Sequence, residues 1–192
     1  MKRRTVLRSA AAVAALGFLI VMVVSGALPK QRALVKFEAK GVMQLAPERI
    51  GRAEIIAEGH RSVFIRQGEK AWSPEGGGAP LPDALAARLS MAVQFMNTSG
   101  PVRVMKPDEY AGVDPAAYGF DRLTLAVALY EGDHRVLAAQ FGSLNPEGYL
   151  QYMRVEGSAD LYLMSRFVGA EWGAVARGEA APAEAAQDES EP

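Results

Sequence analysis

The chain has 192 residues, of which 49% are hydrophobic, and carries a formal net charge of −1. That length suits one modest domain better than a multidomain enzyme. The absence of cysteine excludes disulfides, thiolate zinc sites, iron–sulfur clusters, thiol nucleophiles and a lipid-modified cysteine. Only His60 and His134 are left as histidines for metal binding or acid–base chemistry.

The charge is unevenly distributed along the chain. Lys2, Arg3, Arg4 and Arg8 give the first eight residues a charge of +4, and the segment Gly178–Pro192 has a charge of −5. The remainder holds 17 basic and 17 acidic residues. Nucleic-acid binding requires a clustered excess of Lys and Arg, so this balance argues against a nucleic-acid partner.

A 19-residue run without charge, Ala10–Leu28, follows the basic start. At about 1.5 Å per residue it reaches roughly 28 Å as a helix, which is close to the thickness of a bilayer core. We therefore expect a cytoplasmic basic region (1–9), a transmembrane helix or signal anchor (10–28) and a linker (29–33). The positive charges place the N-terminus inside, so the membrane partner is the bacterial cytoplasmic membrane and the following domain lies in the periplasm or extracytoplasmic space.

Two features of this region leave alternatives open. Ser25, Gly26 and Ala27 are small residues of the kind that signal peptidase prefers, whereas the long apolar run favours a retained anchor. Arg3 and Arg4 resemble the start of a twin-arginine export signal, although paired arginines also occur in ordinary export signals.

The folded part is predicted to span residues 34–176, and its first half is β-rich. Period-two alternation and turn signals predict strands at Leu34–Ala39, Arg52–Ala57, Ser62–Arg66 and Lys70–Ser73. The candidate core residues of these strands are Ile56, Val63, Ile65 and Trp72. A change to three- and four-residue spacing then predicts an amphipathic helix at Pro82–Asn97.

The second half predicts a sheet closed by a helix. The expected strands are Val102–Met105, Leu123–Tyr130, Arg135–Phe141, Tyr149–Val155 and Asp160–Met164. Ser165 is placed to cap a helix at Arg166–Ala176, and residues 177–192 form an acidic tail that we expect to be disordered. The predicted fold class is α+β: an N-terminal transmembrane helix, then an antiparallel β-rich domain with one central and one C-terminal helix.

No catalytic, metal or cofactor site is predicted. His60 and His134 lie in polar turns, and no nucleophile-elbow motif is present. The acidic stretch Asp108–Asp121 lacks EF-hand spacing, and Asp114 is better explained as the cap of a short helical turn at Pro115. The glycine-rich segment Glu75–Pro80 lacks the Lys-Ser or Lys-Thr of a phosphate-binding loop.

Three tyrosines are the candidate binding residues, namely Tyr149, Tyr152 and Tyr162. Tyr149 and Tyr152 differ in parity along one expected strand, so they should face opposite sides of the sheet. At least one should then point away from the core, where it could stack on a sugar or a partner. Ordinary packing within a sheet explains the same tyrosines.

The order of these elements resembles the bacterial family catalogued as domain of unknown function 4340. The resemblance rests on Trp72 at the end of the first β unit and on Tyr118, Gly119 and Phe120 before the strand that contains Leu123–Leu125, and it covers about 49–176. It departs from the family pattern at Phe120, at Asp121 and Arg122, and in having a single copy of the domain. The resemblance implies an N-terminally anchored envelope protein, sometimes associated with ABC-type transporters.

The expected function is therefore that of a non-enzymatic, membrane-anchored envelope protein. It would act as an interaction or accessory module for a transporter or an envelope assembly, with a protein partner in the cell envelope. The alternative is a periplasmic protein that binds a small ligand or a glycan.

Overall fold

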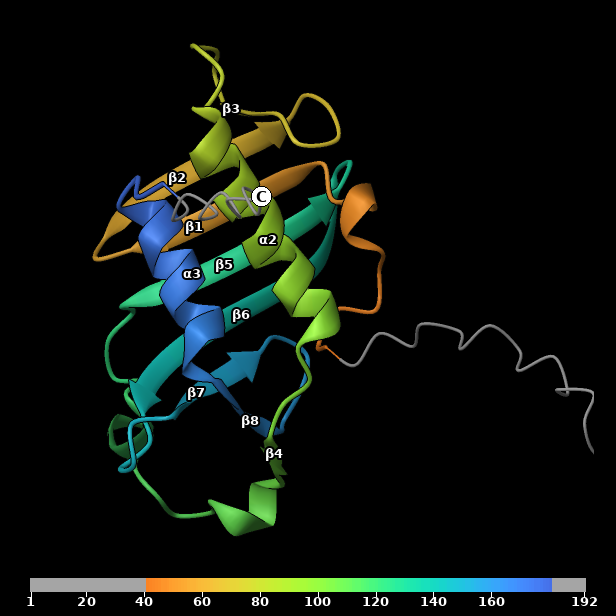
Figure 1. Ribbon diagram of the computed structural model, residues 1–192. Helices are drawn as coiled ribbons and strands as arrows, with labels where there is room; N and C mark the ends of the chain where they lie inside the picture. Colours follow the sequence, from red (N-terminus) through yellow and green to blue (C-terminus); the bar gives the residue numbers. More distant parts are fainter. Residues whose placement is uncertain (1–40, 181–192) are drawn as a thin grey trace, which may run out of the picture. The chain divides into compact units, whose positions relative to one another are not determined.

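The computed structural model describes residues 41–180 (Figure 1). The expected transmembrane segment (10–28), the expected strand Leu34–Ala39 and residues 181–192 of the acidic tail lie outside these residues. Within 41–180, no helix combines the length and the apolar character needed to cross a bilayer.

An antiparallel sheet of eight strands forms the centre of the described part, in the order β3-β2-β1-β5-β6-β7-β8-β4. The strands are β1 (Arg52–Ala57), β2 (His60–Arg66), β3 (Trp72–Pro74), β4 (Arg103–Met105), β5 (Leu125–Glu131), β6 (His134–Leu144), β7 (Leu150–Val155) and β8 (Leu161–Ser165). These strands confirm the predicted antiparallel α+β class, and their ends lie within a few residues of the expected ones.

Most strand pairs are formed by neighbours in sequence, and two pairs, β1–β5 and β4–β8, are long-range. Glu58 and Gly59 both have positive φ, as the tight turn between β1 and β2 requires. Strand β1 also pairs with β5, from Arg52 opposite Tyr130 to Ala57 opposite Leu125. This pairing unites β1–β3 with β5–β8 in a single sheet (Figure 1).

Two helices, α2 (Asp83–Thr98) and α3 (Arg166–Ala176), cover the same face of the sheet (Figure 1). Both predicted helices are confirmed. Their buried side chains pack on alternate residues of the central strands, which are Ile55, Val127, Leu129, Leu137 and Phe141. Full burial of one such side chain stabilises a fold by about 1.5–3 kcal/mol. Across the helix pair, Arg88 Nε of α2 lies 3.1 Å from Glu171 Oε2 of α3.

The predicted core is confirmed in part. Trp72 is fully buried, and its indole Nε1 donates a hydrogen bond to Ser90 Oγ at 2.9 Å. Val63 is also buried. Ile56 and Ile65 are half-buried and, like Val63, point to the face that the helices do not cover, while the core residues of β1 beneath the helices are Ala53 and Ile55.

The two predicted caps have different outcomes. Asp114 Oδ1 accepts a hydrogen bond from the Ala116 backbone N–H at 2.9 Å, which confirms the cap of the short helix η4 (Pro115–Tyr118). Ser165 occupies the N-cap position of α3, but its side chain makes no capping hydrogen bond. The prediction of a side-chain cap at Ser165 is therefore wrong, although α3 begins where it was expected.

The segment 99–124, here called the connector, covers part of the second sheet face. It contains β4, η3 (Pro107–Glu109) and η4. The Tyr118 ring meets the Tyr152 ring edge-on, with centroids 4.8 Å apart. Tyr152 lies on the opposite side of β7 from Met153, which belongs to the core beneath the helices. The connector therefore lies over the face that the helices leave open.

The connector approaches β6 closely at Gly142. A Cβ built at Gly142 would lie 2.2 Å from the Tyr118 carbonyl oxygen and 3.0 Å from the Phe120 ring. We expect Gly142→Ala to lower the free energy of unfolding by about 1–3 kcal/mol, the usual cost of overpacking, measured by urea denaturation. Gly51→Ala is the control, since nothing lies within 4 Å of its Cβ position. Equal stability of the two variants would contradict the close approach.

Candidate functional site

The uncovered face of the central strands has an unusual composition. In β5, large residues point to the helices, while Ala126 and Ala128 point to the opposite face. In β6, Ala138 faces the same way as these two alanines because it pairs with Ala128. An antiparallel sheet with one solvated face normally places polar residues there. Here both sides of the central strands are apolar, and the open side is lined by small residues.

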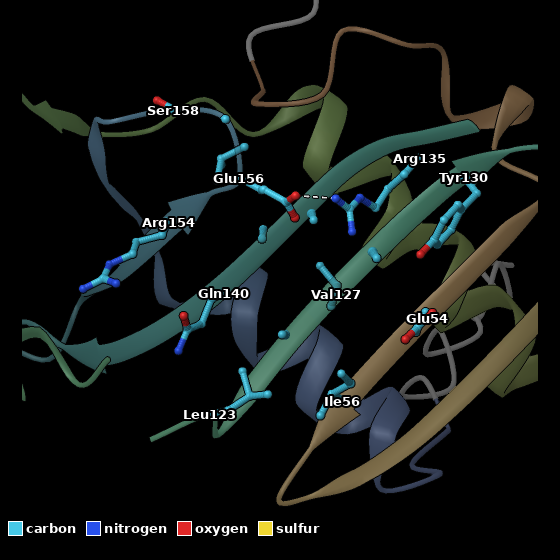
Figure 2. Close-up of a pocket in the computed structure, with 16 residues that line it drawn as sticks. Glu54, Ile56, Leu123, Val127, Tyr130, Arg135, Gln140, Arg154, Glu156 and Ser158 are labelled. Atoms are coloured by element: carbon cyan, nitrogen blue, oxygen red, sulfur yellow. Dashed lines mark hydrogen bonds and ion pairs between the residues drawn. The ribbon is translucent and has the colours of Figure 1, made fainter. Parts of the chain in front are cut away.

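The strand register sets these residues in rows that cross the sheet. One row runs Glu54, Ala128, Ala138, and the next runs Ile56, Ala126, Gln140, Arg154. Neighbouring members of a row are separated by one strand spacing, about 4.7–4.9 Å. Together these rows line a hollow of about 450 Å³, here called the alanine groove (Figure 2). Its floor is formed by Ala126, Ala128 and Ala138.

Both carboxylates at the alanine groove have arginine partners. Glu54 accepts two hydrogen bonds from Arg61, at 2.6 Å from Nε and 2.9 Å from Nη2. The Arg61 hydrogen bond is the main reason that the pKa of Glu54 lies below its ordinary value, with burial acting in the opposite direction. Glu156 turns toward Arg135 and forms an ion pair with it (Figure 2).

Two polar side chains of the groove lack such partners. The Arg154 guanidinium lies 4.0 Å from the centroid of the Phe120 ring in a cation–π contact. Among residues 41–180 it forms no ion pair and no side-chain hydrogen bond. The amide of Gln140, its cross-strand neighbour, is likewise without a hydrogen-bond partner in this part of the chain.

The structure does not bring the three predicted tyrosines together. Tyr149 precedes β7 and is 72% exposed, in the turn after β6. Tyr152 lies beneath the connector against Tyr118. Tyr162 packs against the core beneath the helices, and its hydroxyl lies 2.9 Å from Ser158 Oγ. Because Tyr149 lies outside the strand, the parity argument that related it to Tyr152 does not apply.

The other sequence candidates are dispersed. His60 and His134 each begin a strand and are exposed. Across 41–180, no three His, Asp or Glu side chains lie close enough together to hold a metal ion. Sequence reasoning missed the alanine groove, although the alternation of large and small apolar residues in Leu125–Tyr130 was a signal for it.

No family model, curated protein or solved structure matches this chain. The resemblance to the family of domain of unknown function 4340 therefore stays a prediction, and the site must be interpreted from its own geometry.

The ion pair between Glu54 and Arg61 predicts a pH effect on stability. Because the pKa of Glu54 is lowered in the folded state, its contribution is fully present above the ordinary carboxyl pKa and is lost as the pH falls through the lowered value. We expect Glu54→Gln to reduce the loss of stability on acidification, measured as urea midpoints between pH 6 and pH 3. Glu69→Gln, at an exposed position outside the groove, should leave the slope of the urea midpoint against pH the same as in the parent chain. The same slope in Glu54→Gln and the parent would contradict the prediction.

Proposed function

We propose that the chain is a non-enzymatic, membrane-anchored envelope protein that acts as an interaction module and receives its partner in the alanine groove. The observation that carries this proposal is the group of small apolar residues, Ala126, Ala128 and Ala138, on the uncovered face of the central strands. Segment 10–28 supplies the anchor, so the groove belongs to a domain held at the outer side of the cytoplasmic membrane.

The alanines need an explanation because alanine is a poor strand residue. Threonine, valine or a charged residue would fit a pleated, half-solvated face better. Alanine has one advantage at such positions, which is that another backbone can approach the sheet closely. On its β1 side each row ends in a larger side chain, Glu54 or Ile56, so the approaching element would be held laterally as well.

The charged residues of the groove suit binding better than catalysis. Glu54 is held ionised by Arg61, which makes it a poor general acid, and Glu156 is paired with Arg135. A groove formed by four paired strands is also largely preformed, so binding orders few side chains. These properties support docking of a partner over turnover of a substrate.

The proposal predicts position-specific cross-linking in cells. A photo-activated cross-linking residue at position 128 should join the full-length chain to one discrete partner recovered from the membrane fraction. The matched control is position 94, because Gln94 is exposed on α2, which covers the other sheet face. Ala128→Trp, which fills the groove, should abolish recovery of the same partner when the cross-linking residue is placed at position 56.

Two outcomes would count against this function. Equal cross-linking from positions 128 and 94 would mean that the groove is not the docking surface. A chain that cross-links to no protein from position 128, but is protected against thermal unfolding by a small molecule or a glycan, would favour the alternative of a ligand-binding protein.

A further inference from the structure

The geometry points to Arg154 and Gln140 as a carboxylate-binding pair at the side of the alanine groove. We infer that the occupant is an extended segment of a partner protein in which a Glu or Asp has small residues two positions before and after it, on the same side of the segment. This inference rests on the proposed function, because it specifies the chemistry of the partner that docks there.

The sheet register places the two side chains together. Gln140 on β6 and Arg154 on β7 are directly opposed, and Gln140 is opposed on its other side to Ala126. Side chains opposed in this way on one face have Cβ atoms about 4.5–5.5 Å apart. Both polar residues therefore border the alanine floor and line the hollow.

The charge distribution selects an acidic occupant. Glu54 and Glu156 are each satisfied by an arginine, so neither requires a cation from a partner. Arg154 turns away from Glu156 (Figure 2), and in the described part of the chain no carboxylate pairs with it. Among the charged groups that line the groove, Arg154 is thus the one that has no oppositely charged partner within residues 41–180.

The position of the guanidinium is fixed before binding. Its stacking on Phe120 at 4.0 Å restricts a long side chain that would otherwise lose rotamer freedom when a ligand arrives. Guanidinium is planar and presents paired N–H donors that match the two oxygens of a carboxylate. The amide of Gln140 adds further N–H donors beside it.

The size of the alanine floor restricts which residues of the partner segment can lie near its acidic residue. Alanine side chains leave a shallow hollow of about 450 Å³, in which small residues such as Ala, Gly or Ser would allow close approach. Bulky neighbours would hold the acidic side chain away from Arg154. Residues two positions apart share one side of an extended segment, so an acidic residue with small residues two positions before and after it satisfies the floor and the guanidinium together.

The test uses the full chain in mild detergent and two fluorescent nine-residue peptides, SASAEASAS and SASAQASAS, with both termini blocked. Fluorescence anisotropy should show the Glu peptide binding at least tenfold more tightly than the Gln peptide. Arg154→Gln should remove about tenfold or more of the affinity for the Glu peptide, in line with the usual strength of a hydrogen bond to a charged group. Arg154→Lys should restore only part of it, because lysine lacks the planar fork.

Arg122→Gln is the matched control for the loss of one positive charge. Arg122 is 85% exposed, and its ion pair in the described residues is with its neighbour Asp121. The affinity of the Arg122→Gln variant for the Glu peptide should equal that of the parent chain. Far-UV circular dichroism should show Arg154→Gln folded, with a melting temperature close to that of the parent, since the exposed side chain loses only its cation–π contact with Phe120.

Four results would overturn the inference. Equal binding of the two peptides would show that no carboxylate is recognised, and equal weakening by Arg154→Gln and Arg122→Gln would show attraction to net charge alone. A chain ending at Glu179 that binds the peptide much more tightly would show that its own acidic segment is the occupant. If Ala128→Trp abolishes the cellular cross-link but Arg154→Gln leaves both cross-link and peptide affinity unchanged, docking in the groove stands and the carboxylate assignment fails.

Discussion

Both helices pack on one face of the sheet, and this packing determines what the rest of the described chain can do. An antiparallel sheet has two faces, and α2 and α3 cover the same one (Figure 1). The large side chains of the central strands turn to that side, where Trp172 and Phe141 are fully buried. Within residues 41–180 no α-helix covers the second face, which is divided between the connector and the alanine groove.

The helix pair is itself fixed by an ion pair at its interface. The Arg88 side chain is 9% exposed, and a charge so far from water is costly unless it is paired. Glu171 supplies the opposite charge at 3.1 Å, and the Glu179 carbonyl accepts a hydrogen bond from Arg88 Nη1 at 3.1 Å. Removing Glu171 would leave the Arg88 charge buried without its partner, which is strongly destabilising.

The local elements were predictable because they depend on neighbouring residues. Helix α3 begins and ends at the predicted residues. The predicted amphipathic character of α2 is confirmed by its buried residues at three- and four-residue spacing, which include Leu85, Leu89, Ala92, Val93 and Met96. It was less predictable which face of each strand would be buried. Ile55 and Ile56 are adjacent isoleucines, and only the pairing of β1 with β5, more than 60 residues away, decides which one is buried.

The candidate site was harder to predict for the same reason. Its residues come from four strands, and no short motif contains Glu54, Ala128, Gln140 and Arg154. The alternating alanines of Leu125–Tyr130 look like ordinary core positions until it is known that no helix covers their side. The predicted tyrosines were chosen for residue type alone, and their separation in the structure follows from where β7 and β8 begin.

The connector links the fold to the proposed binding chemistry. Gly119 has positive φ and, like Gly142, leaves no room for a Cβ, since Ser143 N lies 2.4 Å from that position. These two glycines let the Tyr118–Phe120 backbone lie directly against β6. Phe120 is thereby placed under the Arg154 guanidinium. The segment that shields one part of the open face therefore also orients the cation beside the part that stays uncovered, so displacement of the connector would free Arg154 from its position without removing it from the groove.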